Sequence, residues 1–227
     1  MKRTQRRVLD LAGIVHAALG LLDEAGLDEL SMRRLADALG VQNPALYWHV
    51  QNKQALLDHM AQALLVEGFL SVEDGSAKQR SWARRLERFA HALRGAMRSR
   101  KDGARLIAAA NLSQPGGALI IRIEALVNSL VAEGFRASDA LWGVLTLIHY
   151  TLGATLEEQS DPRHGDPGPL PEVSPAMRQM LAEMQMPESG GPSRVDMRFE
   201  FGVALIVEGL RARKRSRQGR QRGRRPK

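Results

Sequence analysis

The sequence predicts an all-α fold. Apolar residues recur three or four positions apart along almost the whole chain, and the alternating pattern of a β-strand is scarce. Hydrophobic residues make up 44% of the 227 residues, which is enough to build a core in one or two domains. No apolar run is long enough to span a bilayer and no secretory signal follows the basic N-terminus, so we expect no membrane partner.

Three short helices are predicted at the front of the chain. The first ends at Gly26 and has one apolar face, made by Val8, Leu11, Val15, Leu19 and Leu22. The second covers residues 32–39, between Ser31, which can cap its first turn, and Gly40, which can end it. Asn43 and Pro44 are typical of the N-cap and first helical residue of a third, very short helix.

Longer helices are predicted behind these three. Asn52 can cap a helix that runs to about Ser71, and breaks rich in glycine then separate four more helices. Their approximate ranges are 78–100, 103–111, 116–133 and 137–158. Five of the ten prolines fall in residues 159–175, which predicts a long loop, followed by a short helix from Pro175 and a last helix from about Ser193 to Arg213.

The net charge of +8 comes from the C-terminal end of the chain. Residues 211–227 hold ten Lys and Arg and no acid, whereas the other 210 residues carry 23 basic and 25 acidic side chains. We therefore expect residues 214–227 to form a disordered basic tail that binds polyanions without sequence preference, and whose deletion makes DNA binding less sensitive to salt. The absence of cysteine excludes disulfides and thiolate metal sites, and a reducing cytoplasm is the simplest location.

Two of the front helices and the turn between them have the proportions of a helix-turn-helix. In such a unit the second helix lies in the DNA major groove, and its N-terminal residues face the base edges. Asn43 can offer two hydrogen bonds to an adenine, and Ala45 can contact a thymine methyl group. Arg33, near the start of the preceding helix, can read a guanine or hold a phosphate.

The aromatic residues that follow suit the DNA backbone. Tyr47 and His49 are placed to reach phosphates or sugars, and Lys53 adds positive charge at the start of the next helix. The alternative is that a short helix with Tyr47 and Trp48 is only a corner of a core, to which we assign Leu46 and Val50 in either case.

The stretch LSMRRLADALGVQNPALYWHVQNKQALLDHM, residues 30–60, closely resembles the DNA-binding domain of the tetracycline-repressor family. The resemblance implies a DNA-binding domain over residues 1–51 and a connecting helix over 52–71. The positions that match the family's DNA contacts are Arg33, Asn43, Pro44, Ala45, Tyr47, Trp48, His49 and Lys53. A glutamine and a threonine look usual at positions 43 and 45 in the tetracycline-responsive type, so the resemblance implies a different operator.

The resemblance continues more weakly to about residue 213, through RKDGARL, EGFRASDAL, HYTLGATLEEQ and FEFGVALIVEGL. It implies that residues 52–213 form a helical domain that binds an effector and dimerises through a four-helix bundle. The residues support a dimer independently, because 141–156 and 201–207 are apolar nearly all round, which a helix on a monomer surface cannot be. The alternative is that both segments are central helices of one large core.

The same resemblance implies an effector site that is more apolar than a tetracycline site. Its matched apolar positions are Phe69, Phe89, Leu93, Ile107, Ala110 and Leu126. Ile107 stands where the tetracycline-responsive type has a metal-binding histidine, so we expect no metal and no other cofactor. A few further positions complete the expected site: Asn111, Trp142, His149, Thr151 and Glu157. This predicts a hydrophobic, multi-ring effector, and His149 could equally be a core histidine.

These features predict a dimeric transcriptional repressor that binds a palindromic operator on double-stranded DNA and is released by a small molecule. The alternative is an architectural DNA-binding protein driven by the basic tail, which needs little specificity and no pocket. An enzyme is not expected, because the sequence has no nucleophile–base–orienter set, no phosphate loop and no HExxH-type metal spacing.

Overall fold

The computed structural model describes residues 9–70, 81–114, 116–160, 174–183 and 193–222, and all regular structure in these ranges is helical. The all-α prediction is therefore confirmed. In chain order the helices are α1 (Leu11–Ala25), α2 (Met32–Leu39), α3 (Asn43–Tyr47), α4 (Lys53–Leu70), α5 (Trp82–Arg98), α6 (Gly103–Ala109), α7 (Ala118–Ala132), α8 (Ala137–Ser160), α9 (Pro175–Glu183) and α10 (Arg194–Arg222). None of the described helices is long and apolar enough to cross a membrane.

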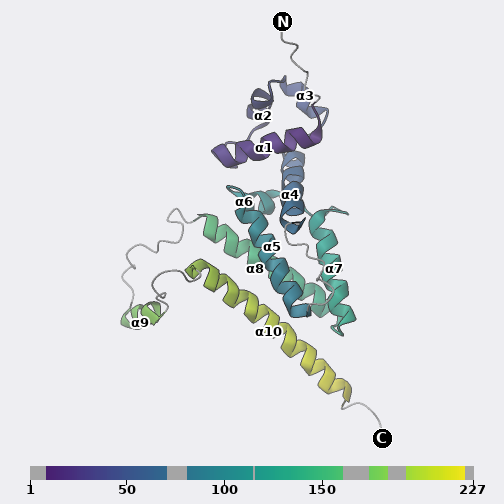
Figure 1. Ribbon diagram of the computed structural model, residues 1–227, viewed down its shortest axis with the longest axis vertical. Coiled ribbons are helices and arrows are strands. Elements are labelled where there is room, and N and C mark those ends of the chain that lie inside the picture. Colours follow the sequence, from purple (N-terminus) through teal and green to yellow (C-terminus); the bar gives the residue numbers. More distant parts are fainter. Residues whose placement is uncertain (1–8, 71–80, 115, 161–173, 184–192, 223–227) are drawn as a thin grey trace.

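Helices α1, α2 and α3 pack together at one end of the molecule, and α4 leads from them into the larger helical body (Figure 1). The predicted caps are confirmed at two of these helices. The Ser31 hydroxyl accepts the backbone N–H of Arg34 at 3.2 Å, and the Asn52 side chain accepts that of Ala55 at 2.8 Å. Gly40 ends α2 with a φ of 66°, a left-handed conformation that glycine adopts without strain.

Two details of the front helices differ from the prediction. Gln42, not Asn43, is the N-cap of α3, because the first backbone turn closes from the Ala45 N–H to the Gln42 carbonyl at 2.9 Å. Leu11 was predicted to lie on the buried face of the first helix, but it is exposed, and Ile14 is fully buried instead. Val8 lies outside the described residues.

The body is built around α5 and α8, which pack on each other and on α10. Helix α4 packs along α5, α7 packs along α8, and short α6 sits against α4, α5 and α8. Buried apolar side chains join all these helices into one core, for example Leu64 of α4, Leu86 of α5, Leu106 of α6, Leu147 of α8 and Val203 of α10.

A buried cation fixes the start of α10 in the body. Arg94 of α5 is 5% exposed, and its guanidinium lies 3.0 Å from Glu158 of α8 and 2.8 Å from Asp196 of α10. It also lies 4.5 Å from the ring centre of Phe199. Since two other helices supply the partners of this one buried charge, the cluster sets how α5, α8 and α10 meet.

The predicted and observed helix ends differ most at the C-terminus. Helix α8 runs to Ser160, so the first two residues of the predicted proline-rich loop are helical, and residues 161–173 lie outside the described part. The short helix from Pro175 is confirmed. Disorder was predicted from residue 214, but helix α10 continues to Arg222. The reason is that Arg, Lys and Gln are good helix formers, which extend a helix that is already anchored.

Candidate DNA-binding surface and effector region

The end of α3 presents aromatic side chains to solvent. Trp48 is 89% exposed and Tyr47 46% exposed, whereas Leu46 and Val50, on either side of them, are buried. The alternative in which the two aromatic residues are a corner of the core is therefore wrong. A large aromatic side chain left in water on a well-packed helix marks a surface that binds something else.

The predicted DNA contacts lie on this one end of the molecule. Ala45 is half-buried, and the other seven side chains are exposed: Arg33, Asn43, Pro44, Tyr47, Trp48, His49 and Lys53. Their positions are fixed from beneath, because the Val41 N–H donates to the Ala36 carbonyl at 3.0 Å and the Val50 N–H to the Leu46 carbonyl at 2.9 Å. The surface is thus centred on the short helix α3, with Arg33 from α2 and Lys53 from α4, and the buried Leu46 and Val50 anchor it in the core.

The N-terminal end of α6 holds this front domain through polar contacts. Arg105 donates to both carboxylate oxygens of Asp28, at 2.7 and 3.0 Å, and Arg100 donates to Asp23 at 2.6 Å. The Asp102 side chain accepts the backbone N–H of Leu27 at 2.8 Å. The hydrogen bond from Arg105 lowers the pKa of Asp28, and the same bond raises the pKa of Arg105.

Backbone geometry shows how closely the start of α6 approaches the turn after α1. Asp102, the N-cap of α6, has a φ of 54°, a left-handed conformation that costs energy for a residue with a side chain. Gly26 faces it with a φ of 85°, and a Cβ on this glycine would lie only 2.8 Å from an Asp102 carboxylate oxygen. These residues could not be predicted as contacts from the sequence, since nothing local in the chain signals that they meet.

The C-terminal end of α6 holds α4. The Asp58 carboxylate accepts the Asn111 N–H at 2.7 Å and the Gln54 amide at 2.9 Å, and the same Gln54 amide donates to the Ala109 carbonyl at 2.9 Å. One turn further along α4, the Gln62 side chain accepts the Ala118 N–H at 2.8 Å. Thus α6 and the loop after it contact the front domain at one end and the connecting helix at the other.

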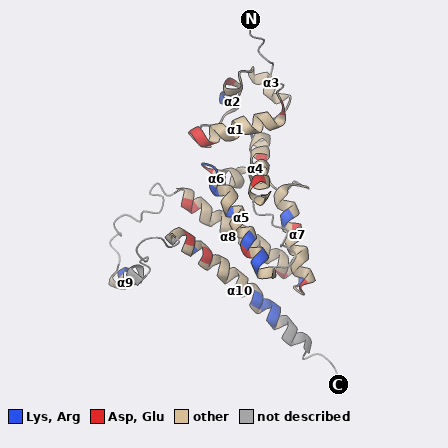
Figure 2. Cartoon of the chain, in the orientation of Figure 1, with Lys and Arg blue, Asp and Glu red and all other residues tan. Residues whose placement is uncertain are grey.

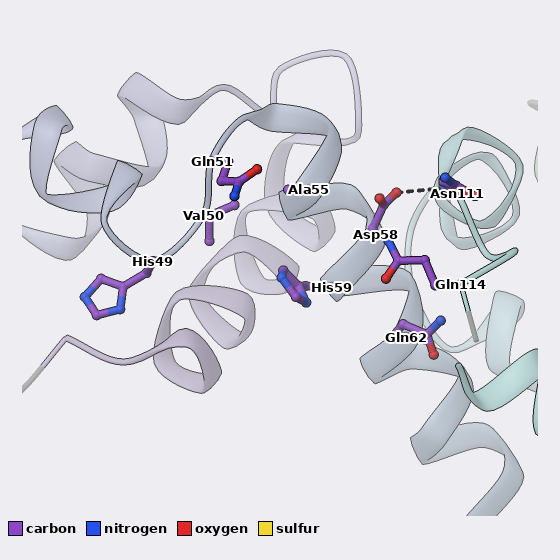
Figure 3. A pocket seen from close by; sticks show the side chains of 9 residues that line it. All are labelled: His49, Val50, Gln51, Ala55, Asp58, His59, Gln62, Asn111 and Gln114. Carbon is purple, nitrogen blue, oxygen red and sulfur yellow. Dashed lines mark hydrogen bonds between the residues drawn. The ribbon is translucent and has the colours of Figure 1, made fainter. Parts of the chain in front are cut away.

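A polar cleft of about 250 Å³ opens between α4 and the loop after α6 (Figure 3). Its lining comes from the end of the front domain, from α4 and from that loop: His49, Val50, Gln51, Ala55, Asp58, His59, Gln62, Asn111 and Gln114. Asn111 was predicted as an effector contact, but it is exposed and lies at this cleft. The cleft therefore lies where the end of the front helices, α4 and the loop after α6 meet.

The apolar positions predicted for the effector lie on or directly after four helices that share one core. The rings of Phe69 on α4 and Phe89 on α5 stack with centroids 5.7 Å apart. Leu93 of α5 and Ile107 of α6 are buried in the same core, and the half-buried Ala110 and Leu126 pack against it. The guanidinium of Arg122 lies 5.4 Å from the centre of the Phe69 ring.

Four of the five remaining predicted positions lie on α8, and they do not converge on this set. The buried Thr151 hydroxyl already donates to the Leu147 carbonyl at 2.7 Å. Trp142, His149 and Glu157 are exposed, and Glu157 accepts a hydrogen bond from Arg198 at 2.9 Å. Spacings of seven and eight residues, about two turns each, put these three on one outward face of α8. The alternative in which His149 is a core residue is wrong for the same reason.

Helices α8 and α10 expose a set of large apolar side chains. Trp142 is 67% exposed and Phe201 66% exposed, and the set also includes Leu141, Met197 and Leu205. Helix α10 packs along α8, and both helices bury their opposite faces in the core. The alternative in which both segments are entirely central to one core is therefore wrong, and the exposed faces are typical of a subunit interface.

The comparisons with known proteins agree with this arrangement. Residues 14–60 match the family of bacterial regulatory proteins called the tetR family, and residues 75–214 match the tetracyclin repressor-like C-terminal domain. The tetracycline repressor protein class A from transposon 1721 of Escherichia coli is 39% identical over 203 residues, which cover 88% of this chain and 90% of that protein.

Two solved structures extend the likeness to three dimensions. A TetR variant from Acinetobacter baumannii AYE in complex with minocycline is 32% identical, with a TM-score of 0.68 over 91% of this chain and 98% of that one. BioQ with its double-stranded DNA operator is 30% identical, with a TM-score of 0.66 over 90% of this chain and 99% of that one. The chain therefore belongs to the TetR family of bacterial transcriptional regulators, which are dimeric, ligand-responsive repressors.

Proposed function

We propose that this repressor reads its operator with α3 of both subunits and is released by a largely apolar small molecule. The observation that carries the DNA assignment is the exposure of Tyr47 and Trp48 on a helix whose Leu46 is fully buried. Asn43 and Ala45, at the N-terminal end of α3, face base edges. Arg33, Tyr47, His49 and Lys53 hold the backbone, with Pro44 and Trp48 packed against the sugars.

We assign residues 1–51 to DNA binding and residues 52–213 to effector binding and dimerisation, with α4 as the link. Binding to DNA places the protein in the cytoplasm, and we propose no catalytic activity for it. The exposed apolar faces of α8 and α10 support the dimer, because two copies can bury Trp142 and Phe201 against each other.

The effector site is proposed to lie among Phe69, Phe89, Leu93, Ile107 and Leu126, which come from α4, α5, α6 and α7 and belong to, or pack against, the same core. The relatives are named for tetracycline or hold minocycline, yet isoleucine at position 107 has no lone pair for a metal ion. Affinity must then come from apolar burial, at about 25 cal/mol per Å². Ala110 packs against the same core, whereas Trp142, His149 and Glu157 face the dimer partner.

Helix α6 is proposed to carry the signal. Ile107 lies on α6 between the contacts to Leu27 and Asp28 at one end and the contact to Asp58 at the other. An effector that displaces Ile107 therefore disturbs both attachments of the front domain. Binding shifts the population between two orientations of the recognition helices, and only one of them fits the operator.

The test is release of a fluorescent operator duplex by hydrophobic multi-ring compounds, in excess EDTA and then with Mg²⁺. We expect release to be the same in both conditions. The Phe89→Ala variant should need at least ten times more compound while keeping its operator affinity. The matched control is Ile121→Ala, an exposed residue of α7 outside the proposed site, which should respond like the unmodified protein.

Two results would overturn the effector assignment. One is tight tetracycline binding that requires Mg²⁺ and is abolished by EDTA, since this needs a metal ligand that Ile107 cannot supply. The other is an equal loss of response in Phe89→Ala and Ile121→Ala. An Ile107→His variant adds a positive reference, because an imidazole at this position should make tetracycline binding dependent on Mg²⁺.

A further inference from the structure

Helix α7 places a charged side chain on its inward face. Leu119 and Leu130 of this helix are buried, and Leu126 between them is half-buried and packs against the core. Arg122 lies three residues after Leu119 and four before Leu126, so helical spacing puts it on the same face, and it is half-buried there. An apolar residue is usual at such a position, because burying it does not remove a charge from water.

The rest of α7 is almost uncharged. Among its fifteen residues Arg122 is the only Lys or Arg, and Glu124 is the only acid. Figure 2 shows α7 as a largely uncharged helix, in contrast with α5, on which basic residues are prominent. Glu124 is exposed and lies two residues from Arg122, which turns its side chain by about 200° to the other side of the helix. The inward face of α7 is therefore apolar with one positive charge on it.

This charge lies next to the aromatic residues of the proposed effector site. The Arg122 guanidinium lies over the Phe69 ring, 5.4 Å from its centre, and the Phe69 ring stacks on that of Phe89. A guanidinium has five N–H donors, so it can lie on an aromatic ring, keep contacts with the protein and still donate to a ligand. The site thus combines flat apolar rings with a set of charged donors.

An anionic oxygen is the chemistry that such donors recognise. The guanidinium fork matches a carboxylate with two parallel hydrogen bonds, and charge assistance makes these bonds stronger than those between neutral groups. An apolar site without a cation rejects a carboxylate, because the charge loses its hydration and gains no partner. A cation in the same site reverses this preference.

We propose that the effector carries an acidic group on its ring system, and that Arg122 binds this group while Phe69 and Phe89 hold the rings. This inference rests on the proposed effector site and adds the charge of the ligand to it. Arg122 then determines specificity, since two compounds with the same rings differ in affinity according to whether they carry an anionic oxygen.

A purely structural role for Arg122 is the alternative. Its aliphatic stem can cover Phe69, and its charge can hold α7 against α4 through the ring. The two roles differ in one observable quantity. A ligand contact affects acids and neutral compounds differently, whereas a packing contact affects both alike.

Matched pairs of compounds separate the two roles. Naphthoic acid, anthracene carboxylic acid and anthraquinone carboxylic acid are each compared with the primary amide of the same ring system at neutral pH, where the acids are ionised. Release of a fluorescent operator duplex is measured for the unmodified protein, Arg122→Met and Arg122→Lys. The control for loss of a positive charge is Arg136→Met, at an exposed arginine directly before α8.

The unmodified protein and Arg136→Met should need at least ten times less acid than amide for half release. In Arg122→Met the preference should disappear or reverse, with the response to the amides kept within about three-fold, because the methionine stem still covers Phe69. Arg122→Lys should keep part of the preference, since a lysine supplies the charge without the fork. Operator affinity without any compound should stay within about two-fold in all four proteins, which also shows that the variants fold.

Three results would contradict the inference and leave the apolar site standing. Equal release by acids and amides from the unmodified protein would show that the site does not select an acid. A preference for acids that persists in Arg122→Met would assign the charge recognition to another residue. An equal loss of response to acids and amides in Arg122→Met would give Arg122 the structural role. Release by none of the compounds from the unmodified protein would instead count against the proposed effector site, and the inference would fall with it.

Discussion

Arg105 donates two hydrogen bonds to Asp28, 2.7 and 3.0 Å long, and thereby joins α6 to the turn that follows α1. The two residues are 77 positions apart in the chain, and they fall in regions that match different family models. With the Asp102 contact to the Leu27 N–H, this pair attaches the front domain to the helix that carries Ile107. This small polar contact is therefore the link through which we propose that the effector region acts on the DNA-binding surface.

Replacing Asp28 with Asn should weaken this coupling. The contact is exposed, so we expect little change in the stability of the fold. The effector should lower the operator affinity less than it does in the unmodified protein, and the operator affinity without effector should change by two-fold or more. The matched control is Glu29→Gln, because Glu29 pairs with Arg34 inside the front domain at 2.8 Å. Fluorescence anisotropy of an operator duplex, with and without effector, measures both quantities. Identical curves for the two variants would contradict the proposed role of Asp28.

The Arg94 cluster predicts a pH dependence of stability. The Ser193 hydroxyl, and then Arg94, lower the pKa of Asp196, so its carboxylate stabilises the fold at pH values above its unfolded pKa of about 3.9. This contribution is lost as the pH falls through the lower, folded-state pKa. We therefore expect Asp196→Asn to lower the urea midpoint at pH 7 and to have a much smaller effect near pH 3.

The control for this pH effect is Glu200→Gln, an exposed carboxylate on the same helix that pairs with His91 at 3.1 Å. It should change the midpoint little at pH 7, since exposed ion pairs contribute little. An Asp196→Asn effect that is as large at pH 3 as at pH 7 would mean that the aspartate acts through its shape and not through its charge.

The exposed faces of α8 and α10 predict the effect of a charge at the dimer interface. Phe201→Asp should dissociate the dimer, because the free energy of burying an unpaired carboxylate against a second copy is larger than the free energy gained from the interface. Ile121→Asp, on the exposed side of α7, should leave the dimer intact. Sedimentation velocity at micromolar concentration distinguishes the two, and a dimeric Phe201→Asp variant would place the interface elsewhere.

The recognition surface predicts two different losses of DNA binding. Tyr47→Ala should weaken binding to all duplexes alike, because a phosphate contact carries no base information. Asn43→Ala should mainly reduce the base preference at one base pair, because a bidentate side-chain contact contributes about 1–3 kcal/mol of discrimination against the wrong base. A randomised operator library measures both. Equal effects of the two substitutions across the library would reject these roles.

Local sequence signals predicted much of the fold and of the DNA-binding surface. Ser31, Gly40 and Asn52 act within four residues of themselves, and the buried Leu46 beside the exposed Tyr47 follows from helical spacing. The same spacing puts His149 on one face of α8 with Trp142, seven residues away, but only the structure shows that this face is exposed. The family resemblance placed His149 in the effector site.

Contacts between distant segments could not be predicted in this way. Asp28 with Arg105, and Asp58 with Asn111, come together only because the core packs α6 against α4 and the front domain. The end of α10 was missed for another reason. A run of arginines is typical of a disordered segment, because like charges repel one another. Here its residues have high helix propensity, and they continue a helix that is anchored in the core.

Selection of DNA ligands from a randomised duplex library tests the central claim most directly. The purified protein should enrich a two-fold symmetric sequence with half-sites about one helical turn apart, on the order of 34–36 Å, and protect it in a footprint. A truncation after Ser216 should enrich the same sequence, because the recognition surface lies on α3. Enrichment of no sequence, or loss of the preference on truncation, would contradict the account and favour an architectural DNA-binding protein driven by the basic tail.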